Sequence, residues 1–175
     1  EALEAERRMF GNHKWVMAYV APRGIGPTRW SGDAKKLNQV KRRFYLLGET
    51  LDGMRVHDLV RSAGALRSIR GMSGVSLWMQ GSGEMAANLL YSSLYVPDVA
   101  RLDLHDLPAS HMDGPAYLNV LRILDLPQTL ALATERTRVV LYQPEAEYDG
   151  FPGKVVEALG LGSKAFGVRK SLPGD

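Results

Sequence analysis

The chain has no cysteine, few aromatic residues and no long apolar run. Without cysteine there is neither a disulfide framework nor a thiolate metal site, and the redox compartment cannot be assigned from the sequence. No apolar stretch approaches the roughly 18 residues that cross a bilayer, and the opening EALEAERRMF lacks the apolar centre of a signal peptide. We therefore expect no membrane partner.

The surplus of positive charge is small, with 22 basic against 19 acidic residues. Basic residues gather in one stretch, at Lys35, Lys36, Lys41, Arg42 and Arg43. No aromatic platform or recognition motif accompanies them, so we interpret them as a solvated face and expect no nucleic-acid partner.

A length of 175 residues, 45% apolar and 23% charged, is typical of one globular domain with one core. We expect residues 1–175 to form a single domain. Because the chain starts without Met, we also expect it to be a piece of something longer.

Short apolar runs alternate with segments of helical periodicity along the chain. Strands are predicted at residues 15–20, 75–78, 99–104, 139–142 and 164–168. Helices are predicted at residues 44–68, 84–94, 117–134 and 155–159, with Pro127 breaking the third near Asp125. This alternation predicts an α/β fold, a three-layer α/β/α sandwich with a mostly parallel sheet.

Four stretches carry a resemblance to a known family: PRGIG at 22–26, the block YLLGETLDGMRVHDLVRSAGALRS at 45–68, VSLWMQGSG at 75–83, and YVPDVARLDL at 95–104. Together they resemble the C-terminal two-thirds of an α/β-hydrolase, in the branch that includes acetylxylan esterases. The resemblance spans residues 15–161 and implies a partial α/β-hydrolase fold that lacks the early strands. It further implies a carboxylic-ester hydrolase lineage, an ester or acetylated glycan as substrate, and no cofactor.

The stretch Gly81-Ser82-Gly83 occupies the place of the nucleophile elbow, whose pattern in the family is G-x-S-x-G. One register puts Gly81 at the nucleophile position and keeps Gly83 as the flanking glycine. The other makes Ser82 the nucleophile but replaces both flanking glycines by Gln80 and Glu84. Bulky side chains there would collide in a tight turn, so the first register is favoured.

The other members of a catalytic triad are incomplete. In this fold the order along the chain is nucleophile, acid, histidine. Glu145, Glu147 and Asp149 stand where the acid belongs, yet the last histidine is His111. A serine without a general base is a poor nucleophile, so the chain looks catalytically degenerate.

An unorthodox triad remains open, with Ser82 as nucleophile, His111 as base and Asp103 or Asp106 as acid, because triads are defined by geometry. The alternative is a polar loop that packs beside the elbow. The same region could suggest a metal site, but its spacing matches no established ligand pattern, so we expect no metal. The residues in question are Asp103, His105, Asp106, His111 and Asp113.

Two functions follow from these observations. The first is an esterase acting through Ser82, and the second is a non-catalytic hydrolase-like module for binding or oligomerisation. A sheet without its early strands exposes an edge that invites pairing. We therefore expect a homo-oligomer or pairing with a missing segment.

Overall fold

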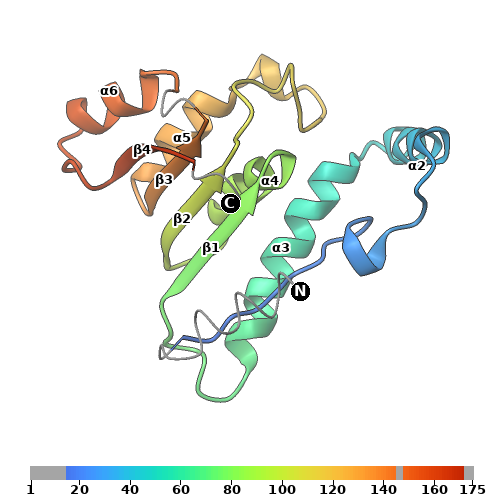
Figure 1. Cartoon of the computed structure of the whole chain (residues 1–175), viewed down its shortest axis with the longest axis horizontal. Helices are drawn as coiled ribbons and strands as arrows, with labels where there is room; N and C mark the ends of the chain where they lie inside the picture. The colour runs from blue at the N-terminus through green and yellow to red at the C-terminus, as the bar shows by residue number, and fades with distance from the viewer. Residues whose placement is uncertain (1–14, 145–147, 172–175) are drawn as a thin grey trace.

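The centre of the protein is a four-stranded parallel sheet, seen in a computed structural model that describes residues 15–144 and 148–171 (Figure 1). The strands, in their spatial order, are β1 (Leu77–Ser82), β2 (Val99–His105), β3 (Arg138–Gln143) and β4 (Phe166–Lys170). All three neighbouring pairs run parallel.

The helices are α2 (Ala34–Leu46), α3 (Leu51–Ser68), α4 (Glu84–Ser93), α5 (Leu126–Thr134) and α6 (Phe151–Ala158). Single turns of 3-10 helix occur at η1 (Gly26–Thr28) and η2 (Val120–Arg122). Helix α4 packs on β1 and β2, α5 on β3 and α6 on β4, while α3 packs against α4. The predicted fold class is confirmed: an α/β arrangement on a parallel sheet, consistent with a three-layer α/β/α sandwich.

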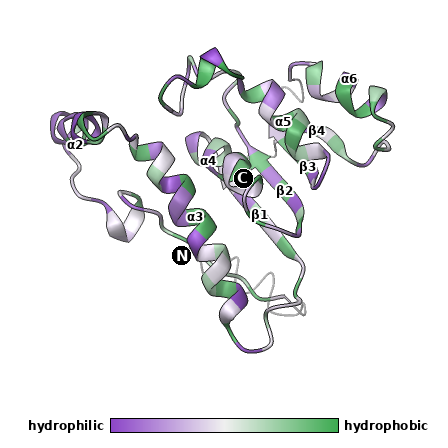
Figure 2. Cartoon of the chain, turned by 180° about the vertical axis from the view of Figure 1, so that it is seen from behind, coloured by the Kyte–Doolittle hydropathy of each residue, from purple (hydrophilic) through white to green (hydrophobic). Residues whose placement is uncertain are grey.

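The two faces of the sheet differ in chemistry because successive side chains of a strand point to opposite sides. One face carries apolar residues that join the core with the helices: Leu77, Met79, Leu102, Leu104, Val139, Leu141, Phe166 and Val168. The other carries polar residues, so both ends of the hydropathy scale occur along β2 in Figure 2. No helix of the described residues is long and apolar enough to cross a membrane.

The expectation of a buried strand at residues 15–20 is wrong. The segment has no regular secondary structure, and its apolar side chains are exposed. It starts beside β1, where the Trp15 and Trp78 rings meet edge to face at 4.8 Å, and then runs toward α3 (Figure 1). Strand composition alone does not supply the neighbouring strand that a ladder of hydrogen bonds needs.

The single helix expected at residues 44–68 is interrupted. Gly48, at φ 74°, ends α2 in a Schellman motif: its amide donates to Tyr45 O at 3.0 Å, and the Glu49 amide donates to Phe44 O at 3.0 Å. Thr50 then caps α3 by accepting a hydrogen bond from the Gly53 amide at 2.9 Å. The end of α2 at a glycine and the start of α3 at a capping threonine are both indicated by the sequence Gly-Glu-Thr.

The break near Asp125 is confirmed, since Asp125 is the N-cap of α5 and forms a capping box with Gln128. Before it, however, the chain makes only the turn η2 rather than a helical piece from residue 117. The closing strand expected at residues 164–168 is present as β4, shifted by two residues.

Candidate active site at the carboxyl edge of the sheet

The turn between β1 and α4 has its crest at Gly83. This residue follows the last residue of β1, precedes the first of α4, and has φ 59° and ψ −134°. Its amide donates to His105 O of the next strand at 2.9 Å, and its carbonyl accepts from the Ala86 amide at 3.0 Å. Residues with side chains are strained in this backbone conformation. The order strand, turn, helix is therefore as predicted, but β1 runs to Ser82, beyond the expected end at residue 78, and the crest is Gly83 rather than Gly81.

Gly81 lets the strand and the helix approach closely. A Cβ atom there would lie 3.3 Å from Met85 O and 3.4 Å from Ala86 N, both in the backbone of α4. This is the role of a flanking glycine in an elbow. The turn geometry thus corresponds to the register Gly81-Ser82-Gly83-Glu84-Met85, which differs from both registers considered on sequence. The sequence pattern did not indicate this register because Met85 stands where the pattern has its second glycine.

Ser82 lies one residue before the crest, on the polar face of the sheet. It is exposed, and its register partner on β2 is His105. The buried His105 ring stacks on Tyr142, with centroids 4.4 Å apart and planes 6° apart, and its Nε2 lies 3.3 Å from Gln80 Nε2. The histidine beside Ser82 is therefore His105, which the proposed triads did not use.

The His111 ring is engaged by hydrogen bonds of its own. Its ring is buried, with Nε2 2.8 Å from Tyr91 Oη and Nδ1 2.9 Å from Pro115 O. Its backbone amide donates to Asp125 Oδ1 at 2.8 Å. Both ring nitrogens are engaged, so the ring has no position left for a serine hydroxyl.

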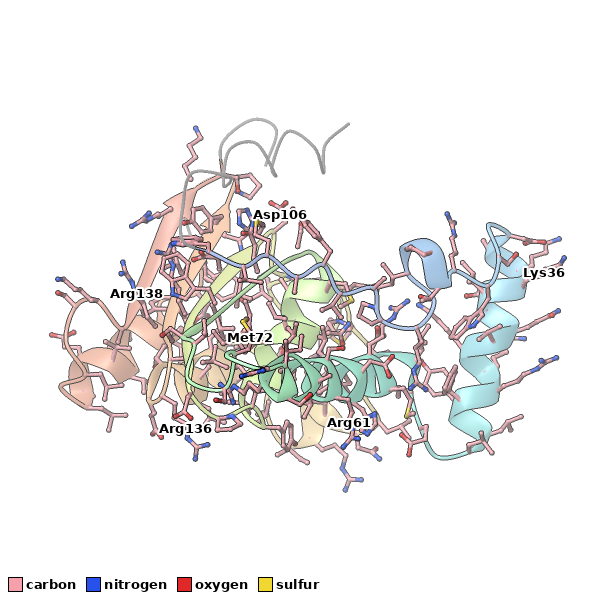
Figure 3. All side chains as sticks on the ribbon, turned by 90° about the horizontal axis from the view of Figure 1, so that it is seen from below. Lys36, Arg61, Met72, Asp106, Arg136 and Arg138 are labelled. Carbon is pink, nitrogen blue, oxygen red and sulfur yellow. The ribbon has the colours of Figure 1, made fainter. Side chains whose placement is uncertain are left out.

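The carboxylates are also not arranged as a triad. Asp106 is exposed just beyond β2, at φ 49°, and its amide donates to Tyr142 O at 2.9 Å (Figure 3). Asp103 accepts a hydrogen bond from Arg101 on the sheet. Within residues 15–144 and 148–171, no hydrogen bond joins Ser82 to His111, Asp103 or Asp106.

Of the three acids that the resemblance would place after β3, Glu145 and Glu147 lie outside the described residues. Asp149 lies just before α6, and its Oδ1 accepts a hydrogen bond from the amide of Phe151, the first residue of the helix, at 2.6 Å. No group of three or more metal-binding side chains that could hold an ion occurs in the part of the chain that the structure describes.

Arg101 is the centre of a cluster on the polar face of the sheet that sequence reasoning missed. Its guanidinium lies 4.7 Å from the Trp78 ring centroid, and it donates to Asp103 Oδ1 at 2.8 Å and to Tyr142 Oη at 3.2 Å. Burial, the largest single effect, lowers the pKa of Arg101, but the hydrogen bonds and charges of Asp103 and Tyr142 together outweigh it, so the pKa is raised. The alternation in VARLDLH was the available signal, since it puts Arg101 and Asp103 on one face.

A second polar cluster lies inside the protein, between α3, α4 and the loop that follows β2. Asp52 accepts hydrogen bonds from Arg55 at 2.9 Å, from the Ala116 amide at 3.3 Å and from Asn88 at 3.4 Å. Tyr117 donates to Asn88 Oδ1 at 2.6 Å. Burial, aided by the charge of Asp52, raises the pKa of Tyr117, so its phenol remains a donor.

The PRGIG turn joins this cluster through Arg23. The Arg23 guanidinium forms a bidentate pair with Asp58 of α3, at 2.8 Å and 2.6 Å, and Arg23 O accepts from Arg55 Nε at 3.2 Å. The hydrogen bonds from Arg23 lower the pKa of Asp58. The hydrogen bonds of Arg23 to Asp58 and Arg55 hold the PRGIG turn against α3. Helix α2 has no buried residue, and its Lys36 lies apart from this region in Figure 3.

Comparison of the chain with models of known protein families, with curated proteins and with solved structures gives no match.

Proposed function

We propose that this chain is a non-catalytic α/β-hydrolase-like domain of carboxylic-ester hydrolase lineage, which acts by binding rather than by hydrolysis. One observation carries the proposal: the crest of the β1–α4 turn, the position of a nucleophile in an elbow, is Gly83 at φ 59° and ψ −134°. Glycine offers no hydroxyl for attack on an ester.

Neighbouring groups do not replace the missing nucleophile. The Ser82 hydroxyl belongs to the strand rather than to the crest, and no base is hydrogen-bonded to it among the described residues. Proton removal by an adjacent base is what makes a serine nucleophilic near neutral pH. His111 is unsuited to that role because Tyr91 and Pro115 engage both of its ring nitrogens.

Through the resemblance, the proposed ligand is an ester or an acetylated glycan that is bound without turnover. The polar face of the sheet offers suitable groups. The Trp78 side chain is 48% exposed, and the planar Arg101 and Asp103 groups lie beside it. A ring surface with a few oriented polar groups is the usual composition of a small-molecule site.

Hydrolysis of a chromogenic acetate ester tests the absence of catalysis. We expect the purified chain, Ser82→Ala and His111→Ala to give the same rate as buffer. A rate above buffer that Ser82→Ala abolishes would establish the esterase alternative instead.

Titration calorimetry with an acetylated xylan oligosaccharide tests the ligand class separately. Binding heat should be seen with the unmodified chain and be lost in Trp78→Ala, while Tyr95→Ala, at another exposed aromatic side chain, should retain it. Absence of heat with the unmodified chain rejects this ligand class, whatever the acetate assay shows.

A further inference from the structure

Positive charge is in excess on the polar face of the sheet. The strands place three arginines on this face: Arg101 on β2, its register partner Arg138 on β3, and Arg169 on β4, which is the register partner of Tyr142. Asp103 is the one acidic residue in the four strand sequences. The strands therefore do not balance the charge of this face by themselves.

Arg138 and Arg101 face each other on neighbouring strands. Trp78, Arg101 and Arg138 are register partners on β1, β2 and β3, so their side chains leave the sheet on the same side. Because neighbouring strands lie ~4.8 Å apart, the backbone of Arg138 is about 5 Å from that of Arg101 and about 10 Å from that of Trp78. Like charges at facing positions are destabilising. A bound anion would relieve this repulsion.

The two arginines differ in their partners. Arg101 donates to Asp103 Oδ1 at 2.8 Å and to Tyr142 Oη at 3.2 Å, and its side chain is only 16% exposed. Arg138, labelled in Figure 3, is exposed, and its guanidinium has no hydrogen bond or ion pair with any other described residue. The donors of Arg138 are therefore available to a ligand, whereas those of Arg101 are partly occupied.

We propose that Arg138 binds a carboxylate of the ligand, so that this face prefers a glycan that carries a uronic acid. The inference rests on the proposed function, because it takes Trp78 as the surface on which a sugar ring packs. A guanidinium binds a carboxylate through two parallel hydrogen bonds, which a lysine cannot form. Strand β2 separates Trp78 from Arg138, so the packed ring and the carboxylate belong to neighbouring sugar residues.

Titration calorimetry with two oligosaccharides that differ in one carboxylate tests this inference. The first is an acetylated xylan oligosaccharide, and the second is the same molecule with a glucuronic acid branch. The unmodified chain should bind the acidic one about fivefold more tightly, as one exposed ion pair near the upper end of its usual strength allows. This preference should shrink as salt is added, because salt screens exposed charges.

Arg138→Gln removes the charge and should bind both oligosaccharides equally, with its affinity for the neutral one unchanged. Arg136→Gln is the matched control, because Arg136 is an exposed arginine in the turn before β3 and lies away from Arg138 in Figure 3. It lowers the net charge by the same amount and should keep the preference. Far-UV circular dichroism should show that both variants fold, since both side chains are exposed.

The outcomes separate this inference from the proposed function. Equal binding of the two oligosaccharides by the unmodified chain overturns the role of Arg138 and leaves the binding function standing. A preference that Arg138→Gln retains, or that Arg136→Gln also removes, overturns that role as well. Absence of binding to either oligosaccharide overturns both the role of Arg138 and the binding of glycans.

Discussion

Two groups of polar side chains in this protein differ in their burial and in their hydrogen bonds. The inner cluster around Asp52 is closed: Asp52 is 3% exposed, Asn88 is fully buried, and every member has a hydrogen-bond partner. At the carboxyl edge of the sheet, Ser82 and Asp106 are exposed, and no hydrogen bond joins their side chains.

This difference in hydrogen bonding distinguishes polar residues that stabilise the fold from polar residues that could catalyse a reaction. Buried polar groups are costly unless they are paired, so a complete network fixes one arrangement of α3, α4 and the loop after β2. A catalytic site needs a nucleophile and a base within hydrogen-bond reach. At the carboxyl edge, the described residues form a tight strand–turn–helix with glycine at its crest, and none of them is a base hydrogen-bonded to Ser82.

Breaking the inner cluster should have the largest effect. Asp52→Ala leaves Arg55, 9% exposed, as a buried charge without its carboxylate. Removing one partner of a buried pair typically costs about 3–5 kcal/mol. Urea unfolding should show this loss of stability, whereas Asp113→Ala, at an exposed loop carboxylate, should change stability by less than about 0.5 kcal/mol. Equal effects of the two substitutions would contradict the assignment of the cluster as structural.

A side chain at the crest of the turn should have an intermediate effect. Gly83→Ser forces a residue with a Cβ atom into φ 59°, which costs about 1–3 kcal/mol although the space around it is empty. Gly64→Ser, within α3 and equally uncrowded, is the control and should be neutral or slightly stabilising. A neutral Gly83→Ser would mean that the crest lies elsewhere.

The smallest effect is expected at the partly exposed pair of Arg23 and Asp58, which is worth about 1 kcal/mol or less. Because the hydrogen bonds from Arg23 lower the pKa of folded Asp58, its contribution is complete above the ordinary aspartate pKa of 3.8. It is lost as the pH falls from there through the lowered value. Unfolding of Asp58→Asn should thus match the unmodified chain at low pH and differ at pH 7. A difference that persists in acid would exclude this linkage.

The local parts of the fold could be predicted from the sequence, and the parts that depend on neighbours could not. The apolar runs of β1 to β3 and the turn glycines carry their own signals, and so does the Asp125 cap. Residues 15–20 have the same composition as a buried strand, but composition does not reveal whether another strand lies beside them.

Of the candidate site, only the turn between a strand and a helix could be predicted from the sequence. The crest depends on the backbone angles of one residue, and with Met85 in place of the second glycine the pattern gave two other registers. His111 is close in sequence to several carboxylates, which suggested chemistry, but its ring points into contacts with Tyr91 and Pro115. Burial and hydrogen bonding of that kind come from the tertiary fold.

Covalent labelling with a fluorophosphonate, which reacts with activated serines, tests most directly whether this chain holds a catalytic serine. The adduct is read by intact mass and peptide mapping. We expect no adduct on the unmodified chain, because the crest is Gly83 and no base among the described residues is hydrogen-bonded to Ser82. A stoichiometric adduct on Ser82 that disappears in His105→Ala or His111→Ala would contradict it.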